Sequence, residues 1–176
     1  MDFVDTLAYK HSKETTNMLV YHIIQTPSSF DHLFSIFVDH DDKIIRQRAA
    51  WVIGDIGVDH PKLLIPYLEP LIHNLQDLNH HNAIYRNSLR ALQFLSIPKH
   101  LQGSLVDSCM NFVTKKSTSI AVRAFSMSIL YNISEEEKDL KNELKIVLED
   151  LLPYASKGEK NRASKILHCL TKELAE

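Results

Sequence analysis

The chain has 176 residues, of which 44% are hydrophobic, and its formal net charge at pH 7 is −2. This length and composition are typical of one soluble domain, residues 1–176, with enough apolar side chains for a core. A near-neutral charge disfavours a protein that lives on duplex DNA, because such a protein needs a strongly basic face.

Apolar residues at spacings of three and four predict a succession of amphipathic helices. Residues 3–10 are interpreted as the remnant of one more helix, which precedes the first full helix at 12–25. Pro66 and Pro70 each remove a backbone hydrogen bond, so we expect a bend there or a helix that begins nearer Ile65. The predicted helices are 12–25, 29–39, 42–57, 61–76, 82–97, 99–115, 118–133, 136–152 and 158–174.

Four of these helices share one pattern: a small residue, an aliphatic pair three and four places later, and an aliphatic–small pair after that. The small residues that open the pattern lie 39, 38 and 37 residues apart, at Ala49, Ser88, Ser126 and Ala163. A repeat of this period predicts a solenoid of stacked helix pairs, here named helix A and helix B of each pair. The predicted core includes Ile45, Val52, Ile53, Ile56, Leu68, Leu71, Leu92, Leu95, Leu105, Ile129, Leu130, Leu148 and Leu167.

Residues 46–57, which read RQRAAWVIGDIG, resemble the second helix of a HEAT repeat, an armadillo-type helical repeat. Asp42 lies six residues before Arg48, as in the HEAT signature, and Pro66 is similar to the proline bend of its first helix. The resemblance covers about residues 26–176 and implies an all-α, right-handed α-α superhelix. It would contain about four HEAT-like helix pairs and an N-terminal half unit.

The other repeats depart from this signature. Asn87 and Phe125 stand at the position of Arg48, and only Arg162 restores the arginine. We therefore do not expect a ladder of Asp–Arg pairs along the stack.

The sequence contains no phosphate-binding glycine loop, no HExxH, no CxxC and no GxSxG motif, so we expect no enzyme activity, no cofactor and no metal site. The ten histidines are scattered, and the pair His80-His81 is interpreted as part of a solvated helix boundary. Cys109 and Cys169 are interpreted as buried free thiols, which suits a reducing cytoplasm. We expect a cytoplasmic protein, because neither a signal peptide nor an apolar run of membrane-spanning length is evident.

The residues of the B helices that point away from the apolar stripe define the candidate binding face. At 100° per residue, the face opposite the stripe in 42–57 contains Gln47, Ala50, Trp51 and Gly54. B helices line the concave side in HEAT-like stacks, so the resemblance implies one continuous inner surface. Its predicted contact residues are Gln47, Trp51, Arg86, Arg90, Gln93, Tyr131, Lys165 and His168.

This face combines the only tryptophan with several cations, which are residue types that dominate binding hot spots. We expect Arg90, the 39-residue successor of Trp51, to lie beside it as a functional cation. In the alternative interpretation Trp51 packs sideways on a neighbouring B helix and the cations are merely solvated.

Three functions remain open. The first is a non-enzymatic scaffold that binds a protein or peptide on the concave face and is a monomer. The second is a nucleic-acid-binding protein that resembles the HEAT-like alkylpurine DNA glycosylases, with aromatic and basic groove residues such as Trp51, Arg86 and Tyr131. Those enzymes need a carboxylate in the groove, and Asp55 lies about 100° off the inward phase. The third is a structural subunit that pairs end to end, although Lys172, Glu173 and Glu176 indicate a polar terminal cap.

Overall fold

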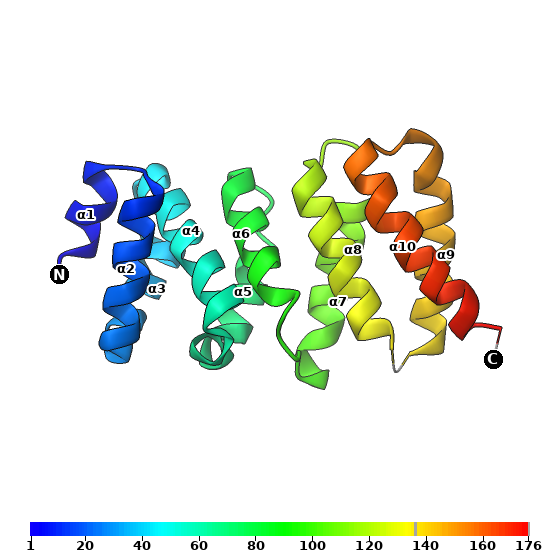
Figure 1. The fold of residues 1–176 in the computed structure, drawn as a ribbon, viewed down its shortest axis with the longest axis horizontal. Helices are drawn as coiled ribbons and strands as arrows, with labels where there is room; N and C mark the ends of the chain where they lie inside the picture. Colours follow the sequence, from blue (N-terminus) through cyan, green and yellow to red (C-terminus); the bar gives the residue numbers. More distant parts are fainter. Residues whose placement is uncertain (136, 176) are drawn as a thin grey trace. The chain divides into compact units, whose positions relative to one another are not determined.

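The computed structural model describes residues 1–135 and 137–175. In these residues the chain forms α-helices and short 3-10 helices, and no strand (Figure 1). The fold class is therefore all-α, as predicted. Contacts between the helices divide the chain into two compact units, Met1–Leu95 and Ser96–Glu176.

The first unit contains two N-terminal helices followed by two helix pairs. Helices α3 and α4 form one pair, and η2 with α5 forms the A helix of the pair that α6 completes. The bounds are α1 Phe3–Tyr9, α2 Lys13–Gln25, η1 Pro27–Ser29, α3 Phe30–Asp39, α4 Lys43–Asp59, η2 Pro61–Tyr67, α5 Leu68–Asn74 and α6 Asn82–Leu92.

The second unit contains two further pairs, in which α8 and α10 are the B helices. The bounds are α7 Lys99–Thr114, α8 Ile120–Ser134, α9 Lys138–Leu151, η3 Leu152–Tyr154 and α10 Lys157–Glu173. Each B helix packs against its own A helix and against the other B helix of the unit. The predicted helix start at 136 and the predicted cap residue Glu176 lie outside the described residues.

The segment 61–76 is not one α-helix. Residues Pro61–Tyr67 form a 3-10 helix that contains Pro66, and the α-helix begins at Leu68, three residues later than the start near Ile65 allowed by the sequence. Pro70 then falls in the first turn of α5, where its missing N–H removes no hydrogen bond within the helix. The prediction for 82–97 was too long, because α6 ends at Leu92 and Leu95 is only half-buried.

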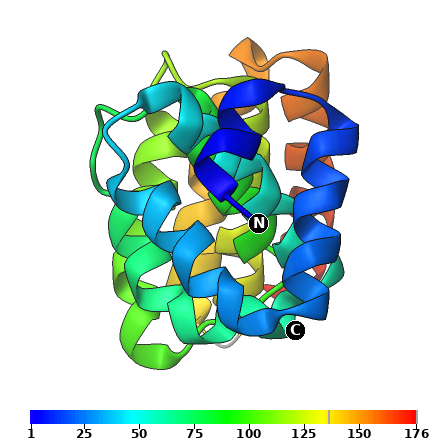
Figure 2. The ribbon, with the colours of Figure 1, turned by 90° about the vertical axis from the view of Figure 1, so that its left-hand side faces the viewer.

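The N-terminal residues form a true helix, α1, with Asp2 as its N-cap. Helices α1 and α2, in dark blue, face the viewer in Figure 2, and both contact α4. The side chains of Phe3 and Leu7 are buried, and the Phe3 ring meets His22 of α2 and His32 of α3 edge-on. Helix α2 thus occupies the place of a B helix before α4, which fits the N-terminal half unit expected from the sequence.

The core lies between the A and B helices of each unit. Of the predicted core residues, Leu95 and Leu167 are half-buried and the others are buried. Leu95 lies beyond the last residue of α6, Leu92, whereas Leu167 lies within α10.

In three successive B helices, the side chain at one repeat position donates to a backbone carbonyl at the end of the preceding A helix or in the connection after it. In α4 the Arg46 Nε donates to the carbonyl of Phe37 at 3.2 Å. At the equivalent positions, the Tyr85 hydroxyl donates to Asp77 O at 2.7 Å and the Arg123 guanidinium donates to Lys115 O at 2.7 Å. Carbonyls near a helix C-terminus lack partners within the helix, so these bonds join the two helices of a pair.

Candidate functional site

The first unit has a pocket of about 430 Å³ beside the N-terminal halves of α4 and α6. The α1–α2 connection closes one side of it, through His11. This volume is at the low end of the range for small-ligand sites and leaves room for a few side chains. The lining residues are His11, Ile44, Gln47, Arg48, Trp51, His81, Ala83, Arg86 and Asn87.

Trp51 is half-buried in the wall of this pocket and contacts an imidazole edge-on. The ring centroids of Trp51 and His11 are 4.6 Å apart and their planes meet at 89°. This is a favourable aromatic geometry. The tryptophan therefore meets the connection between α1 and α2, which neither interpretation of the sequence had foreseen.

Arg48 fixes that connection in place. Its Nη1 donates to the carbonyls of Leu7 at 2.6 Å and Ala8 at 2.9 Å, at the C-terminal end of α1. A cation at this end of a helix also interacts favourably with the helix dipole. No carboxylate among the described residues pairs with Arg48, so its positive charge remains beside the pocket.

The opposite wall comes from the start of α6. The Nδ1 of His81 accepts from the backbone N–H of Ala83 at 3.2 Å and so caps the helix. This bond leaves Nε2 as the ring nitrogen that can carry a proton and donate. The Arg86 side chain is exposed, and Asn87 is buried with its Nδ2 bonded to Ala83 O at 2.8 Å.

The pocket brings together three of the eight predicted contact residues, Gln47, Trp51 and Arg86. Sequence reasoning did not include His11, Arg48 and His81. Arg48 had been noted only as the signature arginine, and both histidines lie at helix boundaries, where the periodicity of a helix gives no direction for a side chain.

Arg90 was expected to be a solvated cation, and the structure instead pairs it within the protein. Its Nη1 lies 2.7 Å from Oδ1 of Asp55 on α4, and both side chains are largely covered. The angle that placed Asp55 off the inner face assumed an isolated helix, whereas a long arginine on the neighbouring helix reaches it. Gln93 donates to the carbonyl of Arg90 at 3.2 Å, so this part of the predicted face is engaged within the protein.

The predicted face is also narrower than a helical wheel indicates. Ala50, Leu89 and Met127 occupy one repeat position that was assigned to the open face, and all three are fully buried. A B helix is covered by its A helix on one side and by a second B helix on another, so less than half of its circumference is free.

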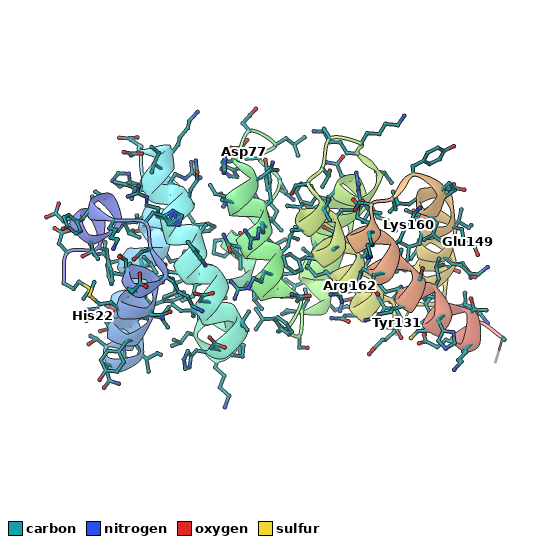
Figure 3. All side chains as sticks on the ribbon, turned by 45° about the horizontal axis from the view of Figure 1, so that its top comes forward. His22, Asp77, Tyr131, Glu149, Lys160 and Arg162 are labelled. Atoms are coloured by element: carbon teal, nitrogen blue, oxygen red, sulfur yellow. The ribbon has the colours of Figure 1, made fainter. Side chains whose placement is uncertain are left out.

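The remaining predicted residues, Tyr131, Lys165 and His168, belong to the second unit. The Tyr131 hydroxyl donates to Oε1 of Glu173 at 2.6 Å, and Lys141 binds the other oxygen of that carboxylate at 2.8 Å. Figure 3 shows Tyr131 near the C-terminal part of α10. Lys165 and His168 are exposed on α10.

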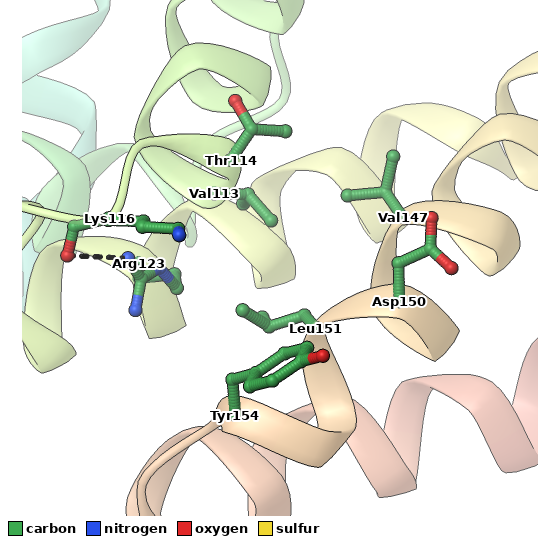
Figure 4. Close-up of a pocket in the computed structure, with 8 residues that line it drawn as sticks. All are labelled: Val113, Thr114, Lys116, Arg123, Val147, Asp150, Leu151 and Tyr154. Atoms are coloured by element: carbon green, nitrogen blue, oxygen red, sulfur yellow. Dashed lines mark hydrogen bonds between the residues drawn. The ribbon is translucent and has the colours of Figure 1, made fainter.

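The second unit has its own pocket, of about 660 Å³, between the ends of α7 and α9 (Figure 4). Its apolar surface comes from Val113, Val147 and Leu151. Its rim contains one basic and one acidic side chain, Lys116 and Asp150. Arg123 forms part of the wall but is bound to Glu159 and to Lys115 O, so its donors serve the fold. Nothing in this mixture favours one class of ligand.

The protein has two free cysteines, Cys109 and Cys169. Burial raises the pKa of the Cys109 thiol to about 12, which keeps it protonated and unreactive at neutral pH. Cys169 is a half-buried free thiol.

In the described part of the chain, no three His, Cys, Asp or Glu side chains are grouped as the ligands of one metal ion would be. Across the same residues, none of the helices has the length and apolar content that a membrane crossing requires.

The sequence signature of the HEAT repeat domain matches residues 3–169. The chain belongs to the HEAT repeat family. Comparisons with curated proteins and with solved structures each gave no significant match. HEAT repeats form rigid helical scaffolds that are typical of protein interaction, and the family is in general non-enzymatic.

Two residues that resemble the HEAT signature, Arg48 and Asp42, form hydrogen bonds within the protein. This HEAT repeat protein keeps the signature arginine in α4, where it binds the carbonyls of α1, and again at Arg162, which is exposed on α10 (Figure 3). Asp42 is the N-cap of α4, and its carboxylate accepts from Ile44 N at 2.7 Å. The signature aspartate therefore acts within its own helix.

Proposed function

We propose that this HEAT repeat protein is a scaffold that binds a peptide segment of a protein partner in the Trp51 pocket. The observation that carries the proposal is the pocket itself, which places a half-buried indole and an exposed guanidinium on a framework of packed helices. Tryptophan and arginine are the side chains that most often dominate binding energy, and a rigid framework loses little entropy on binding.

The glycosylase alternative requires a carboxylate in the groove. None of the residues that line the described pocket is acidic, and Asp55 is paired with Arg90. A carboxylate held by an arginine and largely covered is poorly placed to activate water or stabilise a cationic base. Peptide binding needs no such group, so it is the simpler use of the same side chains.

The single tryptophan allows a direct test, because fluorescence excited at wavelengths that the six tyrosines do not absorb reports on the pocket alone. Peptides without tryptophan would be selected from a random phage-displayed library on the immobilised protein. We expect the selected peptides to change Trp51 emission in a saturable manner. Selection would be repeated on Trp51→Ala, which should no longer retain the same peptides.

Tyr154→Ala is the matched control, since it removes another aromatic side chain, 89% exposed, from the pocket of the second unit. It should leave peptide binding unchanged. Peptides that bind Trp51→Ala as tightly as the unmodified protein would place binding elsewhere and refute the proposal.

A further inference from the structure

The charge of the Trp51 pocket is opposite to that of the whole chain. Its lining includes Arg48 and Arg86 together with two imidazoles, His11 and His81, and no Asp or Glu among the described residues. The protein as a whole has a formal net charge of −2. The positive field is therefore local to this pocket and acts at contact distance, where solvent screens it least.

The two arginines of α6 differ in what they bind. Arg90 forms an ion pair with Asp55 within the protein. Arg86, one turn earlier, is exposed, lines the pocket and forms no ion pair in the part of the chain that the structure describes. A guanidinium presents several donors in a fixed plane that matches a carboxylate, and such charge-assisted bonds are among the strongest in proteins.

The pocket also has an apolar wall. Ile44 is 55% exposed although it is a large aliphatic residue, and Trp51 and Ala83 line the same space. An apolar side chain placed there would be covered by the indole, while groups beside it would meet the cations. A ligand that consists only of charged groups would leave this apolar wall exposed to water.

We propose that the occupant of the pocket is an acidic peptide segment, in which one aliphatic or aromatic side chain lies against Trp51 and Ile44 and a flanking Asp or Glu binds Arg86. This inference rests on the proposed function and names the class of partner: a protein with an exposed acidic segment that contains an apolar anchor. Arg48 contributes its field while its hydrogen bonds hold the α1–α2 connection.

The test uses three series of short synthetic peptides with one central leucine, flanked by glutamate, by glutamine or by lysine, and follows Trp51 emission. The glutamate peptide should bind at least about tenfold tighter than its glutamine counterpart, because one charge-assisted pair is of that strength. Added salt should weaken the glutamate peptide much more than the glutamine peptide. The lysine peptide should bind weakest.

Charge reversal at Arg86 sharpens the result. In Arg86→Glu the order of the three peptides should invert, while Lys165→Glu, the same change at an exposed lysine of α10, should leave the order unchanged. Arg86 is exposed, so circular dichroism and melting should show that both variants fold. Equal binding of all three peptides, or no effect of Arg86→Glu on their order, would overturn the inference.

The remaining outcomes separate this inference from the proposed function. Library-selected peptides that bind the pocket but are neutral or basic would overturn the acidic partner and leave peptide binding intact. Failure of every selected or synthetic peptide to alter Trp51 emission would remove both. A single-stranded oligothymidylate that binds more tightly than the glutamate peptide and is lost in Arg86→Glu would overturn it in favour of a nucleic acid.

Discussion

The two units join their B helices in different ways. In the first unit α4 and α6 approach so closely that a Cβ added at Gly57 would lie 2.2 Å from the Cβ of Ala91. In the second unit α8 and α10 are linked by polar side chains, with the buried Arg123 paired to the buried Glu159 and Tyr131 bonded to Glu173. The same repeat thus accommodates a close contact of small residues, with the partly covered Arg90–Asp55 pair beside it, or a buried ion pair between its B helices.

The difference has consequences for stability. A contact between small residues depends on shape, so added volume should damage it and pH should not. A buried ion pair depends on both charges, because either one alone is left desolvated. The small-residue contact of the first unit should therefore be sensitive to size, and the buried ion pair of the second unit to charge and pH.

The largest effect is expected from breaking the buried pair of the second unit. Glu159→Gln keeps the shape and the capping capacity of the side chain but leaves Arg123 without a counter-charge, so the free energy of unfolding should fall by about 3–5 kcal/mol. Urea denaturation at neutral pH measures this loss. The double variant Arg123→Met with Glu159→Met should recover most of it, and a double variant as unstable as Glu159→Gln would contradict this account.

The pH dependence of the same pair follows from its pKa. Burial raises the pKa of the Glu159 carboxyl, but hydrogen bonds from Ser156 and Arg123 outweigh burial and hold the pKa below the ordinary value of 4.5. A lowered folded-state pKa means stability that is fully present above pH 4.5 and is lost as pH falls through the folded pKa. The stability difference between the unmodified protein and Glu159→Gln should shrink when denaturation is repeated near pH 3.

Added volume should be costly in the first unit. Gly57→Ala forces a methyl group against Ala91 and Leu64, which we expect to lower the free energy of unfolding by about 1–3 kcal/mol. Gly103→Ala in α7 is the control, because a Cβ there meets no atom within 4 Å. It should raise stability by about 0.5–1 kcal/mol through helix propensity. A stabilising Gly57→Ala would show that α4 and α6 can separate at little cost.

A smaller loss is expected for the half-covered ion pair of the first unit. Arg90→Ala should cost about 1–2 kcal/mol, between the values for exposed and buried pairs. The coupling energy from a cycle with Asp55→Ala measures the pair itself. A coupling near zero would restore Arg90 as a solvated cation available to a ligand.

The smallest change should occur at the pocket. Arg86→Ala should alter the free energy of unfolding by less than about 0.5 kcal/mol, because the side chain is exposed. Thermal melting measures this change beside that of Arg90→Ala. A loss as large as that of Arg90→Ala would mean that Arg86 serves the fold and would weaken its assignment to binding.

Much of the fold could be predicted because helical periodicity is local. The spacing from Ala49 to Ser88 and from Ser126 to Ala163 gave the repeat, and nearly all predicted core residues are buried. Helix ends were predicted less accurately. The helix predicted for 82–97 ends at Leu92 in the structure, and no pattern of residue spacing marks that end. Of the candidate site, helical phase predicted Gln47, Trp51 and Arg86, which line one pocket in the structure.

The sequence by itself determined the helices, their pairing and the buried stripe, because these follow from residue spacing within one helix and its nearest neighbour. Only the tertiary structure decided that Arg90 reaches Asp55, that His11 meets Trp51 and that Arg123 is buried against Glu159. Each of these contacts joins side chains from separate elements, 35 to 40 residues apart. Which long side chain reaches which partner depends on how closely two helices pack, and that distance is set by the small residues between them.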